Sequence, residues 1–170
     1  INSDLSLGGE YEYKGNNFEF TINPDFSQVE ADQSKINVNS TTALRFEERR
    51  IFFNEGKDFL SSDLSTVYTR SINNPDYAMK LYNRGEKHSY YFLDAEDSNT
   101  PIIVPGYQRS YSGLLGKSHA NIFSYNYNIE KGKNIGFLTT NRDFEEGGSS
   151  SLFSLKGNFL FNDIEYHHRH

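Results

Sequence analysis

Apolar and polar residues alternate with a period of two along most of this 170-residue chain. Over residues 5–13, the odd positions carry Leu, Tyr or Gly, and the even positions carry Ser, Gly or Glu. A Gly15-Asn16 pair follows, and the alternation resumes over residues 17–22. Because successive side chains of a strand point to opposite faces, two alternating runs joined by such a pair predict a β-hairpin.

The same pattern returns later in the chain. Further strands are expected over residues 67–72, 78–84, 88–94, 109–115, 123–129, 135–139, 153–161 and 164–168. The only candidate for a helix is residues 43–53, whose 3.6-residue periodicity is poor. About ten strands joined by short connections predict an all-β fold, an antiparallel up-and-down meander. Because no linker divides the chain, residues 1–170 are expected to form a single domain.

Composition limits what this meander can be. Aromatic residues make up 15% of the chain, which argues against disorder, although the mean hydropathy is -0.73 and the net charge is -6. The absence of Cys excludes disulfides, Cys-based zinc sites and thiol catalysis. The acidic charge and the lack of a basic stripe argue against a nucleic-acid partner. Two architectures stay open from periodicity alone, the wall of a membrane β-barrel and a soluble β-sandwich.

One segment departs from the simple strand pattern. Residues 23–56 concentrate carboxylates and the neighbouring Arg49 and Arg50 beside four Phe residues. Carboxylates and guanidinium groups need each other when they leave water. The sequence therefore predicts an irregular segment, near residues 23–60, that folds inward against the sheet.

Two motifs in this segment carry a family resemblance. Residues 23–32 read Asn-Pro-Asp-Phe-Ser-Gln-Val-Glu-Ala-Asp, and residues 46–56 read Phe-Glu-Glu-Arg-Arg-Ile-Phe-Phe-Asn-Glu-Gly. They resemble the signature of a bacterial outer-membrane β-barrel domain of unknown function that follows a carbohydrate-binding, family-nine-like module. Residues 68–70 and 140–143 resemble two shorter elements of the same barrels, whereas Ile51, Ser71 and Asn73 depart from the family pattern.

The resemblance implies a location and a set of partners. It places the chain in the outer membrane of a Gram-negative cell, as the N-terminal part of a barrel whose later strands and upstream glycan-binding module lie outside this sequence. The expected partners are the lipid bilayer, other envelope proteins, and glycan through the upstream module. No cofactor is expected. A polar cluster lining the lumen is predicted from the motifs, with a structural role for Asn23, Asp25, Gln28, Glu30, Asp32, Glu48, Arg49, Arg50, Glu55 and Arg70.

The same kinds of residue allow other functions. The pairs Glu30/Asp32 and Glu47/Glu48 are candidates for general acid–base catalysis, as in a glycosidase. Asp25, Glu30 and Asp32 could bind calcium, but they lack a regular calcium loop. His168 and His170 would share a strand face and could bind a metal. We predict a non-enzymatic barrel segment, with a soluble carbohydrate-binding β-sandwich and a carboxylate-based glycosidase as alternatives.

Overall fold

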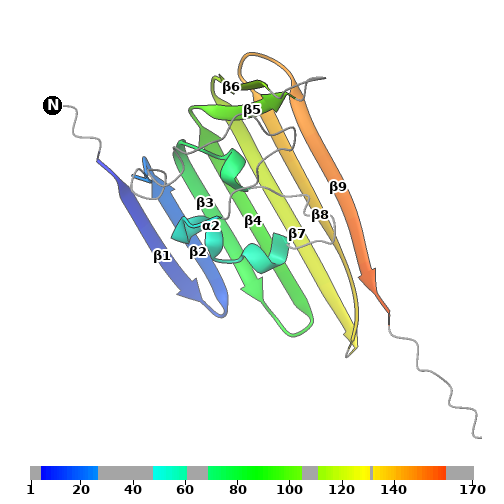
Figure 1. The fold of residues 1–170 in the computed structure, drawn as a ribbon. Helices are drawn as coiled ribbons and strands as arrows, with labels where there is room; N and C mark the ends of the chain where they lie inside the picture. Colours follow the sequence, from blue (N-terminus) through cyan, green and yellow to red (C-terminus); the bar gives the residue numbers. More distant parts are fainter. Residues whose placement is uncertain (1–4, 27–47, 61–68, 105–110, 131, 160–170) are drawn as a thin grey trace, which may run out of the picture.

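The computed structural model describes residues 5–26, 48–60, 69–104, 111–130 and 132–159. Seven antiparallel strands form one sheet in the order β1-β2-β3-β4-β7-β8-β9, and a two-stranded hairpin, β5-β6, lies across one end of it (Figure 1). The strands are β1 Leu7–Tyr13, β2 Asn16–Ile22, β3 Pro75–Arg84, β4 His88–Asp97, β5 Thr100–Val104, β6 Tyr111–Leu115, β7 Ser118–Glu130, β8 Lys133–Phe144 and β9 Ser149–Asn158.

The sheet is an open meander. Apart from the β5-β6 hairpin inserted between β4 and β7, each strand pairs with the next along the chain, and β1 and β9 lie at opposite edges (Figure 1). The all-β prediction and the antiparallel up-and-down order are thus confirmed. Within the described residues the sheet does not close into a barrel.

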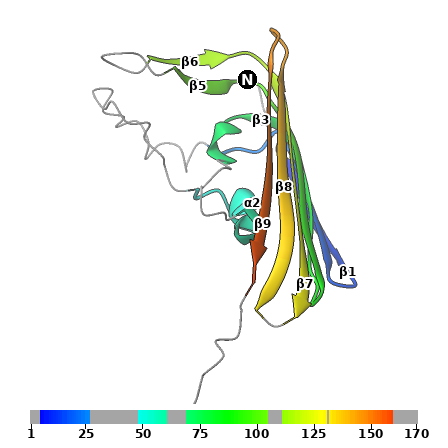
Figure 2. The ribbon, with the colours of Figure 1, turned by 90° about the vertical axis from the view of Figure 1, so that its right-hand side faces the viewer.

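Short helical elements lie on one side of the sheet. They are the α-helix α2, Ile51–Asn54, and the 3₁₀ helices η2, Lys57–Leu60, and η3, Thr69–Ser71. Seen along the sheet edge, these elements and the β5-β6 hairpin occupy the same side (Figure 2). We call the covered side the inner face and the opposite side the outer face. Among the described residues, no helix is long and apolar enough to cross a membrane.

The first hairpin forms as the alternation predicts. Tyr13 pairs with Asn16, so the two-residue turn is Lys14-Gly15, one position earlier than the Gly15-Asn16 turn expected. Both turn residues have positive φ, +50° at Lys14 and +76° at Gly15. This is the backbone conformation that a tight hairpin turn requires, and glycine adopts it without steric cost.

Three expectations for secondary structure need correction. Residues 69–71 form a 3₁₀ helix and not part of a strand, because the carbonyls of Thr69 and Ile72 accept hydrogen bonds from the Arg50 side chain instead of from a neighbouring strand. The expected helix is limited to α2 within the described residues. Strand β5 was not expected, since Pro101 interrupts its alternation. The predicted strand over residues 164–168 lies outside the described residues.

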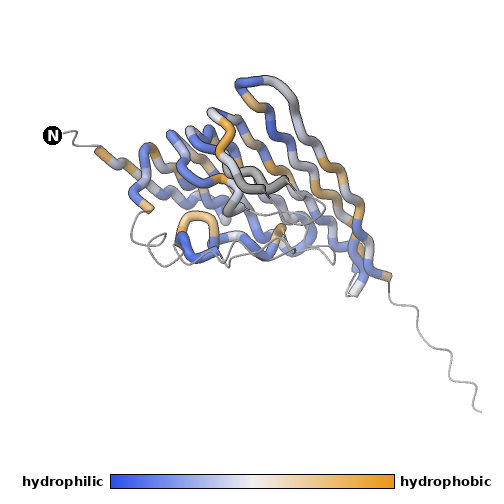
Figure 3. Tube along the Cα trace, turned by 45° about the horizontal axis from the view of Figure 1, so that its top comes forward, coloured by the Kyte–Doolittle hydropathy of each residue, from blue (hydrophilic) through white to orange (hydrophobic). Residues whose placement is uncertain are grey.

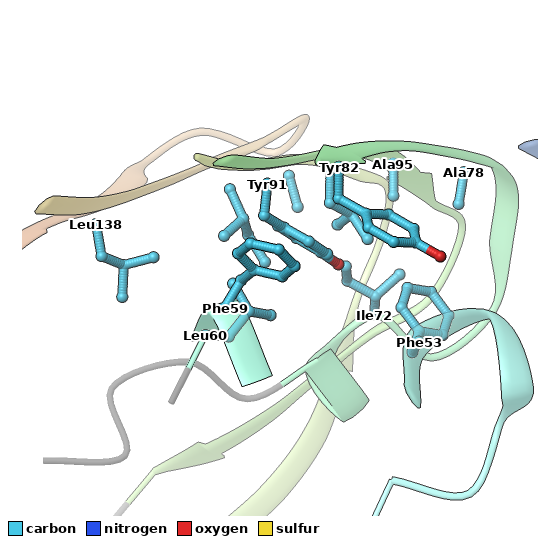
Figure 4. Packing of buried hydrophobic residues seen from close by; sticks show 12 residues of the cluster. Phe53, Phe59, Leu60, Ile72, Ala78, Tyr82, Tyr91, Ala95 and Leu138 are labelled. Atoms are coloured by element: carbon cyan, nitrogen blue, oxygen red, sulfur yellow. The ribbon is translucent and has the colours of Figure 1, made fainter. Parts of the chain in front are cut away.

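A hydrophobic core fills the space between the inner face and the helical segment (Figure 4). Tyr91 and Leu93 of β4 are fully buried there, and Phe53 of α2 and Phe59 of η2 close over them. The rings of Phe59 and Tyr91 are stacked with centroids 5.9 Å apart. The segment around α2 and η2 therefore folds inward, as the sequence predicts for residues near 23–60 in the part that the structure describes.

Candidate functional site: inner charged clusters and an outer apolar band

Arg50 stands at the centre of a buried charged group on the inner face. Its Nε and Nη2 donate to the two carboxylate oxygens of Glu48, at 2.8 and 2.7 Å. Nη1 donates to the Ile72 carbonyl at 2.5 Å and Nη2 to the Thr69 carbonyl at 3.2 Å. The guanidinium carbon lies 4.2 Å from the centre of the Phe53 ring. This set of contacts joins the start of α2 to η3.

Glu48 is equally well bound. Its Oε1 accepts the Arg50 backbone N–H at 3.1 Å, and its Oε2 accepts the Thr69 hydroxyl at 2.8 Å. Burial raises the pKa of Glu48, but the hydrogen bonds and positive charge of Arg50, with the Thr69 hydroxyl, hold the net pKa below its ordinary value. Because both carboxylate oxygens are occupied, this geometry suits a fixed structural anion rather than a group that exchanges protons.

Lys80 organises a second buried group. Its side chain is fully buried, and Nζ lies 2.8 Å from Glu19 Oε2 and 3.8 Å from Glu55 Oε2. Nζ also donates to the carbonyl oxygens of Phe52 and Glu55, at 2.6 and 3.2 Å. The carbonyls at a helix C-terminus lack partners within the helix, and a cation there satisfies them. Lys80 of β3 therefore fixes the end of α2 to the sheet.

Two further contacts hold η2 against the sheet. The Ser124 hydroxyl of β7 donates to the Phe59 carbonyl at 3.0 Å. Gly56 has φ +76°, and a Cβ at this position would meet the Tyr91 ring at 2.9 Å. Glycine is thus required here both for its backbone conformation and for the close approach to the ring.

The predicted lumen cluster is brought together only in part. Among its members, Glu48 and Arg50 form the buried pair, and Glu55 reaches Lys80 with a side chain that is 46% exposed. Asn23 lies at the end of β2, where its backbone N–H donates to the Asp76 carbonyl at 2.8 Å. Asp25 and Arg49 are exposed.

Several predicted site residues cannot be placed in the cluster. Gln28, Glu30, Asp32 and the side chain of Arg70 lie outside the described residues, as do Glu47, His168 and His170 of the catalytic and metal alternatives. No group of three or more His, Asp or Glu side chains in the described part of the chain is arranged to hold a metal ion. The sequence analysis did not predict the roles of Glu19 and Lys80. Each is a charged residue between two apolar residues of a strand, so the alternation alone places it on the face opposite the outer apolar band.

The outer face carries an apolar band that no other part of the described chain covers. Figure 3 shows the alternation of hydrophobic and hydrophilic positions along the strands that creates it. Phe153 and Leu155 of β9 are 66% and 71% exposed. We call these outward residues the outer apolar band: Leu7, Tyr11, Tyr13, Phe18, Phe20, Ile22, Tyr77, Met79, Leu81, Tyr90, Phe92, Phe123, Tyr125, Tyr127, Ile135, Phe137, Phe153 and Leu155.

Polar groups border this band near the β5-β6 hairpin. Asp94 accepts hydrogen bonds from the Tyr77 hydroxyl at 3.0 Å and from the Asn121 side chain at 3.2 Å, and its Oδ2 lies 3.0 Å from His119 Nε2. Next to it, Lys117 bridges two carboxylates, Asp76 at 2.8 Å and Glu96 at 3.2 Å. These two acceptors raise the pKa of Lys117 to about 12.

A second polar border lies near the β1-β2 turn. The Tyr90 hydroxyl bonds to Asn16, and the Asn83 side chain donates to the Gly15 carbonyl at 2.7 Å. The outer face is thus divided into an uncharged apolar band with hydrogen-bonded polar groups at its two ends.

Comparison with known proteins gives one match. Residues 15–90 match the model of a family described as a domain of unknown function (DUF5916). The matched stretch runs from the first hairpin turn into β4, and it contains Glu19, Glu48, Arg50 and Lys80. No curated protein and no solved structure matches the chain. Similarity to an uncharacterised domain is therefore established over these residues, in line with the resemblance seen in the sequence motifs.

Proposed function

We propose that this sheet is a segment of the wall of an outer-membrane β-barrel with a non-enzymatic role. The outer face would contact lipid, and the inner face would line a lumen partly filled by α2 and η2. A wall of this kind can serve the passage of solutes, the surface display of a glycan-binding module, or assembly with other envelope proteins. The partners in this proposal are the bilayer and envelope proteins, and no cofactor is involved.

The observation that carries the proposal is the distribution of polarity between the two faces. The covered inner side holds the buried charges of Lys80, Glu19, Arg50 and Glu48 together with the hydrophobic core, whereas the uncovered outer face still holds aromatic and aliphatic side chains. Water as the outer solvent would favour polar side chains on the outer face, because exposed apolar area is unfavourable there. Lipid as the outer solvent favours apolar side chains outside and polar ones inside.

Strand geometry supports the same proposal. β3, β4, β7, β8 and β9 are 10 to 13 residues long. A strand that crosses a bilayer at the usual tilt needs about 9–11 residues. The outer apolar band is also rich in Tyr and Phe toward its ends, as expected at a membrane interface.

A lysine substitution on the outer face tests this proposal in the full-length protein. Leu155→Lys should lower the free energy of unfolding in lipid vesicles by about 2–4 kcal/mol, the cost of a lysine among acyl chains. The matched control is Ser151→Lys, which lies on the same face of β9 beyond the band and should cost about 0–1 kcal/mol. In water, both lysines would replace exposed residues and change stability by less than about 0.5 kcal/mol.

Cell fractionation gives the second measurement. The proposal predicts that the protein stays in the membrane fraction after a carbonate wash and is extracted by detergent. A monodisperse protein in the soluble fraction, together with a neutral Leu155→Lys, would overturn the proposal. That result would favour the carbohydrate-binding β-sandwich, whose exposed Tyr side chains of β1 would then face a glycan.

A further inference from the structure

The outer apolar band crosses the strands obliquely. We call residues that pair with one another across neighbouring strands a lateral row. The row of Met79 in β3 continues through Asp94 and Asn121 to Asn141 in β8, so it begins in the band and ends among polar residues. The next-but-one row toward the β1-β2 turn shows the reverse order. It runs from Asn83 of β3, through Tyr90 and Tyr125, to Phe137 of β8.

The slope of the band follows from these pairings. In β3 the band is centred on Met79, whose lateral row reaches β8 at Asn141. In β8, however, the band lies at Phe137, which is four residues from Asn141 along the strand. Four residues span about 14 Å along a strand, and the three strand spacings from β3 to β8 span about 14 Å across the sheet. Between β3 and β8, the band therefore makes an angle of about 45° with the lateral rows.

A flat bilayer explains this slope. Strands of a membrane barrel are tilted by about 35–45° from the barrel axis. The hydrocarbon layer of a flat bilayer has a constant thickness. It therefore crosses tilted strands at positions that move along the strand from one strand to the next. The band also carries no formal charge that would pair with a charged protein partner.

The polar borders of the band shift in the same direction. Toward β7 and β8, the border is formed by Asp94 with His119 and Asn121. Toward β1 and β2, the border lies at the opposite end of the sheet, where Asn16 and Asn83 are bound. Each polar border thus lies where strands tilted in a flat bilayer would emerge from the hydrocarbon layer.

We infer that the bilayer midplane passes through Met79 of β3 and Phe137 of β8, with the strands inclined by about 45° to the membrane normal. In this frame Asn141 and Asn83 lie at opposite headgroup regions, although each shares a lateral row with a midplane residue. The inference rests on the proposed function, because it specifies how the proposed membrane wall is oriented.

Four single-cysteine variants of the full-length protein test the inference. The 170-residue chain contains no Cys, so each variant adds a single thiol to it. Met79→Cys, Asn141→Cys, Asn83→Cys and Phe137→Cys are labelled with one thiol-reactive fluorophore and reconstituted in vesicles. Quenching by lipids brominated near the acyl-chain end reports depth. We expect several-fold stronger quenching at positions 79 and 137 than at positions 141 and 83.

The outcomes separate the inference from the proposed function. Equal quenching within each row, 79 with 141 and 83 with 137, would overturn the oblique placement while leaving the membrane wall intact. Quenching at none of the four positions would overturn both. If a variant fails to fold, Phe20→Cys replaces Met79→Cys and Asn16→Cys replaces Asn83→Cys, because each substitute lies only one strand spacing, about 5 Å, from the residue it replaces.

Discussion

Arg50 and Glu48 form an ion pair in which nearly every polar atom has a defined protein partner. The guanidinium group binds a carboxylate on one side and the carbonyls of Thr69 and Ile72 on the other. Removing one partner of a buried ion pair leaves an uncompensated charge, which costs more than the pair itself contributes. The buried pair therefore gives a direct test of whether the inner segment depends on charge compensation.

A double-mutant cycle measures this dependence. Arg50→Met should lower the free energy of unfolding by about 3–5 kcal/mol, because Glu48 stays buried without its cation. The double variant Glu48→Gln/Arg50→Met should cost less than Arg50→Met alone. Urea unfolding in detergent micelles measures both, and Arg49→Met is the control because Arg49 is exposed. Equal destabilisation by the single and double variants would contradict the prediction.

The lowered pKa of Glu48 predicts a pH dependence. A carboxylate with a lowered folded pKa stabilises the protein above its unfolded pKa, and this contribution is lost as the pH falls through the folded pKa. Glu48→Gln cannot titrate. The stability difference between the unsubstituted protein and this variant should thus be constant near neutral pH and shrink below the ordinary value of 4.5. Measuring the free energy of unfolding of both proteins from pH 7 downward tests this prediction. A stability difference that grows on acidification would contradict it.

The sequence predicted part of this residue-level arrangement. Dense opposite charges near Phe residues indicated that Glu48 would be buried with Arg49 or Arg50, and the structure buries Arg50 with Glu48 and leaves Arg49 exposed. The pairing of Lys80 with Glu19 was not predicted, because the two residues are 61 positions apart and meet only through the register of β2 against β3. Alternation tells which face a residue occupies, but it does not give the register that places two strands side by side.

The segment from Ile51 to Leu60 acts as one element held against the sheet. Lys80 binds the end of α2, Ser124 binds η2, and Gly56 between them packs on the Tyr91 ring. Its two helices are too short to be stable alone, so their stability comes from docking. Contacts at this junction should therefore control whether the whole element stays in place.

A pair of glycine substitutions tests the junction. Gly56 and Gly15 share a φ of +76°, so alanine causes the same backbone strain of about 1–2 kcal/mol at each. Gly56→Ala also forces a Cβ to within 2.9 Å of the Tyr91 ring, whereas at Gly15 the nearest atom is 3.4 Å away. Gly56→Ala should thus cost about 1–3 kcal/mol more. It should also speed tryptic cleavage after the exposed Lys57, and equal effects at the two positions would refute this.

Element prediction from sequence succeeded where local pattern determines structure. The hairpin of β1 and β2 was expected because the alternation is regular over residues 5–13 and 17–22 and a Gly/Asn turn pair separates the two runs. Residues 69–71 were expected in a strand, but they form η3 because Arg50 binds the carbonyl of its first residue, Thr69, and that of Ile72, which follows it. Tertiary contacts of this kind override local preference, and they leave no mark in a window of a few residues.

At the scale of the whole molecule, the two faces of the sheet differ in what completes them. The inner face is completed by the chain itself, through the core and the two charged groups. No other part of the described chain covers the outer face, and in the proposed membrane wall lipid would complete it. The alternation predicted both faces, but it did not predict which face the irregular segment would cover, because that choice depends on the long connection between β2 and β3.

If the outer apolar band contacts lipid as proposed, its height predicts which bilayer thickness suits the protein. In β3 and β7 the band spans five residues, Tyr77 to Leu81 and Phe123 to Tyr127. Five residues are about 17 Å along a strand, which at a tilt of 35–45° gives a height of about 12–14 Å. This is less than the roughly 25 Å band of a typical barrel. Thinning a bilayer to match costs a fraction of a kcal/mol per ångström.

The folded fraction should therefore be higher in vesicles of short-chain lipids than in vesicles of long-chain lipids, as read from heat-modifiable gel mobility. Thr139→Leu/Asn141→Leu extends the band along β8, because both residues lie on the outer face directly after Phe137. This variant should raise the folded fraction in long-chain lipids. Ser150→Leu adds a leucine at a similar height on the inner face and should not. A gain from the inner leucine equal to that from the outer pair would show that hydrophobicity alone, and not the height of the lipid-facing band, sets the preference.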